Sequence, residues 1–118
     1  MSADLTVTVR EQDDRLVVLT VVGVLDHDTS GTLFEQATAA VGAGRHLVLD
    51  LSRVTFCDSS GLNTLLRLHR HGRADGAALT LVAVPAQLRR LLRITGTDTV
   101  LTLRDNLAEA GAARTGTQ

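Results

Sequence analysis

The stretch that decides the fold is residues 46–62, which read HLVLDLSRVTFCDSSGL. Residues 46–51 are mostly apolar, and this pattern predicts a strand. Residues 52–57 are predicted to form a connection, and the Asp58-Ser59-Ser60-Gly61 tetrapeptide then supplies the small polar residues with which helices begin. Because strands that alternate with helices build parallel sheets, this stretch indicates an α/β fold.

Two strand patterns precede this stretch. Residues 5–10 alternate between apolar and polar side chains, and residues 16–22 are apolar nearly throughout. The first pattern is typical of an edge strand with one wet face, and the second of a central strand buried on both faces. The polar turn EQDDR at 11–15 is short, so it predicts an antiparallel hairpin.

The rest of the chain alternates between helix and strand patterns. The further elements that we expect are a loop over 23–29, a helix that begins at 28–30 and ends before Gly42, a helix that begins at 58–61, a strand over 78–84, a helix that begins at Pro85 and ends at Gly96, and a strand over 100–103. Helical crossovers between strands predict mostly parallel pairing. The fold class is therefore α/β, with a mixed, mostly parallel sheet in which an N-terminal hairpin precedes alternating helices and strands.

The length of 118 residues suits one domain. We expect a single domain over 1–118 with its core over about 5–107. A short helix over 105–113, interrupted by Gly111, and a disordered tail over about 114–118 complete the prediction.

Composition excludes several classes of function. All twelve basic residues are arginine, which excludes a Schiff-base lysine, a P-loop lysine and a kinase ATP-binding lysine. Phe34 and Phe56 are the aromatic residues, too few for the stacking platforms that bind single-stranded nucleic acid. With a formal net charge of −1, we expect neither nucleic acid nor membrane as a partner.

Cysteine usage and the N-terminal sequence indicate a compartment. Cys57 is the sole cysteine, so neither an internal disulfide nor a multi-cysteine zinc site is expected. The first ten residues are polar and alternating, unlike a signal peptide, and no apolar run is long enough for a transmembrane helix. We therefore expect a cytoplasmic protein.

Two segments are expected at the carboxyl ends of strands, where α/β sheets collect their ligand and partner sites. They are residues 23–29 (GVLDHDT) and residues 55–62 (TFCDSSGL). If the second and third strands are neighbours, Asp26 and Asp58 lie on the same rim of the sheet, near Ser59.

The DSSGL segment at 58–62 resembles the STAS domain, in particular the stand-alone bacterial anti-sigma factor antagonists. Residues 49–62 (LDLSRVTFCDSSGL) are similar to the family's strand, connection and helix start. Residues 23–26 (GVLD) match its G-x-L-D loop, and residues 85–92 (PAQLRRLL) look like its third helix. Two positions depart from the family pattern: Val24 stands where many relatives carry a polar residue, and Cys57 where methionine or another apolar residue is frequent.

The resemblance implies a function and a set of partners. Ser59 would be phosphorylated by a partner anti-sigma factor serine/threonine kinase, which the unphosphorylated domain binds so that a sigma factor is released. A PP2C-type phosphatase would restore the active form, and the domain would be a monomer or weak dimer without cofactor or metal. The partner-binding residues that the resemblance implies are Asp26, Asp58, Ser59, Ser60, Gly61 and Asn63.

The residues themselves leave alternatives open. Ser59 and Ser60 can be plain helix caps, with Ser60 the expected cap, and Asp26 and Asp58 can be turn residues. A phosphate on Ser59 would be stabilised by helix N–H groups and opposed by Asp58 and Asp26, so partner binding should be lost. The alternative function is a STAS scaffold or accessory domain of a transporter or signalling complex, never phosphorylated.

Catalysis is not expected. The sequence around Ser59 lacks the first glycine of a G-x-S-x-G nucleophile elbow, and His27 is the histidine expected on its rim, with no partner specified to orient it. His69 and His71 diverge on a helix and are expected on the surface rather than as metal ligands. Cys57 is expected to be a small buried hydrophobe rather than a redox switch.

Arginines form two sets on the expected helices. Arg67, Arg70 and Arg73 share one helical face, and Arg89, Arg90 and Arg93 share another more loosely. Each set is either a solvated surface or a contact surface for an acidic partner.

Overall fold

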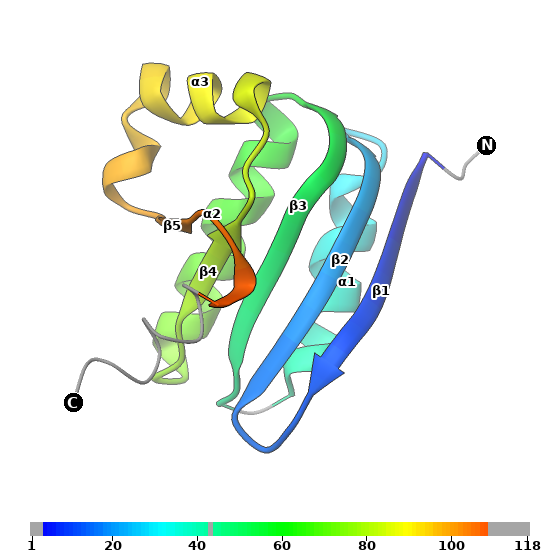
Figure 1. Cartoon of the computed structure of the whole chain (residues 1–118), viewed down its shortest axis with the longest axis vertical. Coiled ribbons are helices and arrows are strands. Elements are labelled where there is room, and N and C mark those ends of the chain that lie inside the picture. The colour runs from blue at the N-terminus through cyan, green and yellow to red at the C-terminus, as the bar shows by residue number, and fades with distance from the viewer. Residues whose placement is uncertain (1–3, 43, 109–118) are drawn as a thin grey trace.

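Within residues 4–42 and 44–108, which the computed structural model describes, five strands form one sheet in the order β1-β2-β3-β4-β5 (Figure 1). The elements are β1 (Leu5–Gln12), β2 (Leu16–Leu25), α1 (Ser30–Val41), β3 (His46–Cys57), α2 (Ser59–Ala74), β4 (Leu79–Val82), α3 (Ala86–Thr95), the 3₁₀ turn η1 (Thr97–Thr99) and β5 (Thr102–Arg104). β1 pairs with β2 antiparallel, and the other pairs are parallel. The predicted hairpin and the mostly parallel sheet are confirmed.

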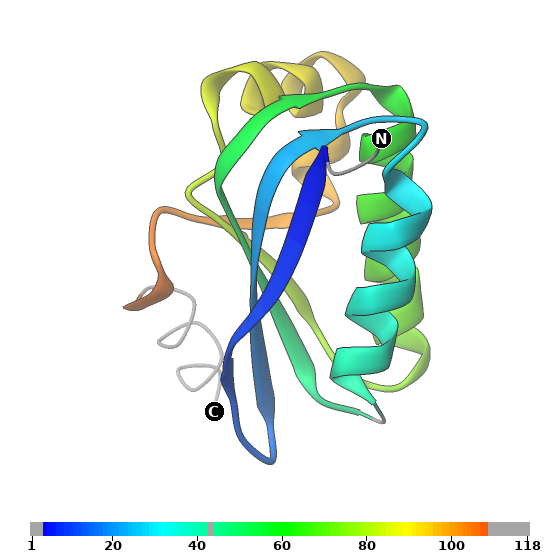
Figure 2. The same cartoon turned by 90° about the vertical axis from the view of Figure 1, so that its right-hand side faces the viewer.

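The helices gather on one side of the sheet. Figure 2 shows α1 and α2 side by side against one face, and α3 lies at the end of the sheet beside the point where β3 finishes (Figure 1). Parallel neighbours in chain order produce this layering, because each right-handed crossover places its helix on the same face. Leucines from every layer fill the core between sheet and helices: Leu19, Leu25, Leu33, Leu49, Leu51, Leu65, Leu81, Leu88 and Leu92.

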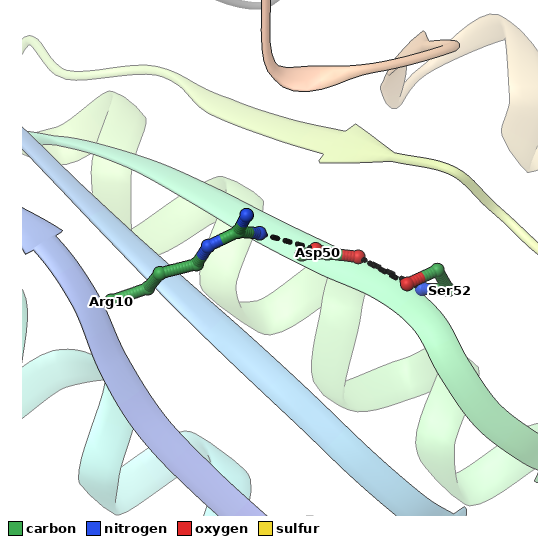
Figure 3. Close-up of polar contacts among 3 residues, drawn as sticks. All are labelled: Arg10, Asp50 and Ser52. Carbon is green, nitrogen blue, oxygen red and sulfur yellow. Dashed lines mark hydrogen bonds and ion pairs between the residues drawn. The ribbon is translucent and has the colours of Figure 1, made fainter.

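The other face of the sheet carries a small apolar cluster and an ion pair. Val18, Val48 and Val82 pack together there. Arg10 on β1 donates to the Asp50 carboxylate on β3 at 2.9 Å, and the backbone N–H and hydroxyl of Ser52 donate to the same carboxylate at 3.0 and 2.8 Å (Figure 3). The pair reaches across β2 and ties the edge strand to the centre of the sheet.

β2 and β3 are longer than predicted, and this corrects two expected loops. Residues 52–57, predicted as a connection, continue β3, and residues 23–25, predicted as the start of a loop, continue β2 and pair with them. The register shifts at two points along this pairing, between Thr20 and Val22 and between Gly23 and Val24. These irregularities break the two-residue alternation of buried and exposed side chains that identifies a strand in a sequence.

The helices α1 and α3 begin and end at the residues predicted from the sequence. α1 ends before Gly42, and the Arg45 guanidinium donates to the carbonyl of Val41 at 3.0 Å. α3 begins after Pro85 and ends at Gly96, whose φ of 78° is the left-handed conformation that glycine adopts readily. Most of the helix predicted over 105–113, and the predicted tail, lie outside the described residues.

Candidate functional site

β2 and β3 end side by side, and this places the two expected segments together. Leu25 and Cys57 are partners in the parallel register, and the Asp58 N–H donates to the Leu25 carbonyl at 3.2 Å. Asp26 and Asp58 therefore follow neighbouring strand ends, as predicted. We call the site formed by Asp26, Asp58 and Ser59 the Ser59 rim.

Asp26 organises the turn between β2 and α1. Its carboxylate accepts from the backbone N–H groups of Asp28 at 2.9 Å and Thr29 at 3.2 Å. The buried Thr29 hydroxyl donates to the Val24 carbonyl at 2.8 Å and accepts from the Asp26 N–H at 2.9 Å. The alternative of Asp26 as a turn residue is thus confirmed. The role of Thr29 in holding this turn was not predicted from the sequence.

Asp58, and not Ser60, caps α2. Asp58 has an extended backbone, with φ −101° and ψ −172°, and its carboxylate accepts from the Gly61 N–H at 3.0 Å. The expectation that Ser60 caps the helix was therefore wrong. A cap must precede the first helical residue so that its side chain can fold back on the first turn, and Ser60 already lies inside that turn.

Ser59 is the first residue of α2, and its side chain is exposed. Among hydrogen bonds between described residues, none involves the Ser59 hydroxyl. Ser60 is half-buried, and Asn63 is exposed one helical turn after Ser59, on the same side of the helix. Ser59 and Asn63 thus present polar groups to solvent at the Ser59 rim.

Gly61 lets α2 approach the end of β2 closely. A Cβ atom at this position would lie 2.6 Å from the Leu25 carbonyl oxygen and 2.7 Å from the Cys57 Sγ. Gly61 is buried, and its expected contact with a partner stays a prediction. The close approach instead explains why a residue without a side chain stands here.

Cys57 lies beneath the Ser59 rim and is fully buried, as a small hydrophobe is expected to be. Burial, with a smaller contribution from the negative charge of Asp58, raises the pKa of the thiol to about 12. Thiolates rather than thiols are the reactive form of cysteine, so this environment makes Cys57 inert near neutral pH.

Gln87 on α3 holds the backbone of Cys57. The Cys57 N–H donates to Gln87 Oε1 at 2.9 Å, and Gln87 Nε2 donates to the Cys57 carbonyl at 2.8 Å. β4 pairs with β3 over Leu47–Asp50, well before this point, so the Gln87 amide takes the place of a neighbouring strand. Sequence reasoning missed Gln87, because the contact joins residues far apart in the chain and a glutamine in a first helical turn is unremarkable.

An apolar surface borders the polar residues of the Ser59 rim. Phe56 is 47% exposed, and its partner in the parallel register, Val24, is half-buried. Val24 was noted as a departure from the family pattern, and the structure places it beside the aromatic ring position of β3. Together they give the end of the sheet an apolar surface that a partner protein can cover.

The first set of arginines lies away from this site. The Arg67 guanidinium stacks over the Phe34 ring, 4.0 Å from its centroid, and His71 meets the same ring edge-on at 6.1 Å. Half-burial, and then the charges of Arg73 and Arg70, lower the pKa of His69. Arg67 therefore packs α2 against α1, while His71 is exposed as expected.

The site presents an exposed hydroxyl at the first residue of α2. No hydrogen bond in the described part of the chain joins a histidine or carboxylate to the Ser59 hydroxyl. Within residues 4–42 and 44–108, no cluster of three or more His, Cys, Asp or Glu side chains is placed to hold a metal. Over the same ranges, no helix has the length and apolar character needed to span a bilayer.

Residues 7–110 match the family model described as the STAS domain. The chain is 29% identical over 97 residues to a protein named anti-sigma F factor antagonist from Paenibacillus polymyxa, which covers 80% of this chain and 83% of that protein. The crystal structure of an anti-sigma factor antagonist from Mycobacterium paratuberculosis is similar with a TM-score of 0.81 and 32% identity, covering 96% of this chain and 97% of that one. The murine anion transporter Slc26a9 is similar with a TM-score of 0.79 and 19% identity over 97% of this chain and 22% of the transporter, a likeness of fold alone.

Proposed function

Because the chain belongs to the STAS domain family, we propose that it is an anti-sigma factor antagonist whose binding to its partner is switched by phosphorylation of Ser59. The names of the relatives from Paenibacillus polymyxa and Mycobacterium paratuberculosis support the first part of this proposal. The partner is an anti-sigma factor serine/threonine kinase, which releases a sigma factor when this protein binds it. A PP2C-type phosphatase reverses the modification, and the cycle runs in the cytoplasm.

The observation that carries the proposal is the exposure of the Ser59 side chain. Its side chain is exposed at the first position of α2, while its neighbours Asp58 and Gly61 are committed to the helix cap. A kinase must reach the hydroxyl and place it in line with the γ-phosphate of ATP. A free hydroxyl on a fixed backbone meets this requirement without any rearrangement of the fold.

Electrostatics explains how the modification acts as a switch. A phosphoserine carries about −1.5 to −2 charges at neutral pH. It would stand beside Asp58 and near Asp26, whose carboxylates already make the Ser59 rim acidic. Like charges and the cost of removing a dianion from water both oppose burial of this surface against a partner. The unphosphorylated rim, with Phe56 and Val24 beside it, is the form that binds.

Asp26, Asp58, Ser59, Ser60, Gly61 and Asn63 are the residues that we assign to the partner interface. Ser59 and Asn63 are exposed, which supports direct contact with the partner. Asp26 and Asp58 act chiefly through the shape and charge of the Ser59 rim, since each carboxylate already accepts backbone hydrogen bonds. The buried Gly61 contributes by allowing the close approach of α2 to β2.

A STAS scaffold or accessory domain is the competing function. The likeness to Slc26a9 concerns the fold and carries no argument for transport. A scaffold needs no modifiable serine at the start of α2, so the two functions differ in whether Ser59 is phosphorylated and whether that phosphate alters binding.

The test combines phosphate mapping with affinity measurements. The purified protein is incubated with each anti-sigma factor kinase of its own organism and ATP, and phosphate is located by mass spectrometry. We expect phosphate on Ser59 of the wild type, a complex that Ser59→Ala retains, and an affinity at least about tenfold weaker for Ser59→Asp. Ser60→Ala is the matched control, because it alters the adjacent serine and should still be phosphorylated at Ser59. Absence of binding to every such kinase would contradict the proposed function.

A further inference from the structure

The outer face of α3 carries an exposed apolar stripe. A surface hollow of about 460 Å³ is lined by Ala86, Gln87, Arg90, Leu91 and Ile94. Ile94 is 73% exposed, the highest value among the exposed large apolar side chains of the described residues. We call the hollow and its lining residues the α3 groove. Ile94 lies one helical turn after the half-buried Leu91, which lines the same hollow, so the two side chains form one apolar patch of the kind that partner proteins cover.

The helix that carries the groove is strongly basic. The ten residues of α3 include Arg89, Arg90 and Arg93 and no acidic residue. All three arginines are exposed, and no carboxylate in the described part of the chain lies within ion-pair distance of them. Arg90 lines the groove itself, so a cationic guanidinium stands beside the apolar floor. This combination fits a ligand that is both acidic and apolar.

The α3 groove is continuous with the Ser59 rim. Gln87 lines the groove, and its amide also binds both backbone groups of Cys57, the residue before Asp58. The exposed Phe56 adjoins the same point of β3. Figure 1 shows α3 crossing the end of the sheet where β3 finishes. The groove and the Ser59 rim therefore adjoin at Gln87, so that one partner protein can contact both.

We propose that the α3 groove is a second docking surface for the partner that binds the Ser59 rim. Its occupant is an acidic segment of that partner protein, with a large apolar side chain seated against Leu91 and Ile94 and carboxylates facing Arg90 and its neighbours. This inference rests on the proposed function, since it names a further contact with the same partner. For the second arginine set, it adopts the contact surface rather than the solvated surface.

The two surfaces respond differently to phosphorylation. A phosphate on Ser59 adds negative charge to the rim and leaves the arginines of α3 unchanged. The phosphorylated protein thus keeps a residual affinity that depends on α3 and weakens with salt, because exposed charges are screened within a Debye length of about 10 Å at 0.1 M salt. Phosphorylation of Ser59 therefore lowers the affinity for the partner without abolishing it.

The experiment measures dissociation constants of the full chain for the anti-sigma factor kinase identified through Ser59. We expect Arg90→Glu and Ile94→Ala each to weaken binding by about tenfold. Arg15→Glu is the matched control, because it makes the same charge change on an exposed residue at the hairpin, the end of the sheet opposite the Ser59 rim. In the Ser59→Asp background, the residual affinity should fall further with Arg90→Glu and with added salt. Circular dichroism spectra and thermal midpoints confirm that each variant is folded.

The outcomes separate the two proposals. If the wild-type chain binds no anti-sigma factor kinase, both the proposed function and this inference are overturned. If the wild type binds the kinase, and Arg90→Glu and Ile94→Ala bind it as tightly as Arg15→Glu does, the proposal for the α3 groove alone is overturned. Vesicles of phosphatidylglycerol and phosphatidylcholine are tested in parallel. Vesicle binding that depends on Arg90 and Ile94, with partner binding unaffected by both changes, also overturns it, because the groove then serves a lipid surface.

Discussion

At the Ser59 rim, each residue around the serine has a structural task of its own. Asp26 holds the turn before α1, Asp58 caps α2, and Gly61 allows the two segments to touch. In the part of the chain that the structure describes, the Ser59 hydroxyl takes no part in these hydrogen bonds. Modification of Ser59 therefore changes the charge of the rim without breaking any contact that holds it together.

Gly61→Ala is expected to destabilise the fold strongly. The new Cβ would stand 2.6 Å from a backbone oxygen of Leu25, which belongs to a buried strand and cannot move aside cheaply. We expect the free energy of unfolding to fall by about 2 kcal/mol or more, the usual cost of overpacking. Urea denaturation followed by circular dichroism measures the change.

Gly31→Ala is the control for this prediction. Gly31 also lies in the first turn of a helix, α1, and a Cβ built there meets nothing within 4 Å. Alanine is the better helix former, so this change should raise stability by up to about 1 kcal/mol. Equal effects of the two substitutions would contradict the role assigned to close packing at Gly61.

At the scale of elements, α3 completes the edge of β3 that β4 leaves unpaired. β3 extends beyond its pairing with β4, and the Gln87 amide receives the exposed backbone groups of Cys57. The position of the first residue of α2 thus depends on a side chain from α3. This link makes α3 part of the support of the Ser59 rim as well as a surface of its own.

Gln87→Ala should loosen the end of β3. Two hydrogen bonds to part-buried backbone groups are lost, and at about 1 kcal/mol each we expect stability to fall by about 2 kcal/mol. Amide hydrogen exchange read at Cys57 should accelerate more than exchange in β1. Gln36→Ala, on the exposed side of α1, is the control and should alter neither quantity. An unchanged Cys57 exchange rate in Gln87→Ala would show that the clamp does not fix this backbone.

Prediction from sequence succeeded where a pattern is local. The hairpin and the helix ends at Gly42 and Gly96 follow from turn residues and polarity within a few positions. The adjacency of Asp26 and Asp58 followed from the expectation that the second and third strands are neighbours in the sheet. The wrong predictions have physical causes. Register shifts disrupt the alternating pattern of the second half of β3, so that it was not predicted as a strand. Asp58 rather than Ser60 caps α2, because the cap is the residue before the first helical residue, which is Ser59. Gln87 escaped notice because its partner is distant in the chain.

For the molecule as a whole, the composition allows the titration of the Cys57 thiol to be followed with little interference from other side chains. The chain contains no lysine and no tyrosine, whose side chains ordinarily titrate between about pH 9 and 11. Between about pH 9 and 11, Cys57 is therefore the side chain whose proton uptake differs between folded and unfolded states. Its ordinary pKa of 9.0 rises to about 12 on folding, because burial disfavours the thiolate.

Stability should consequently fall with rising pH in this range. Above pH 9 the unfolded chain releases the thiol proton while the folded chain keeps it, so unfolding becomes more favourable. From pH 9 to 10.5 we expect the free energy of unfolding to drop by about 1–2 kcal/mol. Urea denaturation across this range measures the slope, and Cys57→Ala should be flat over it. A variant that declines as steeply as the wild type would assign the effect to another group.

The order of the strands also shapes how the molecule is made. Each strand pairs with the strand that precedes or follows it in the chain, so the sheet can grow strand by strand as synthesis proceeds from the N-terminus. β2, β3 and the start of α2 can assemble before residue 86 has left the ribosome. A nascent chain of that length already presents Ser59 but lacks Gln87, the amide that fixes the backbone beside it. Ser59 is therefore translated early, and its surroundings reach their final rigidity only when α3 docks.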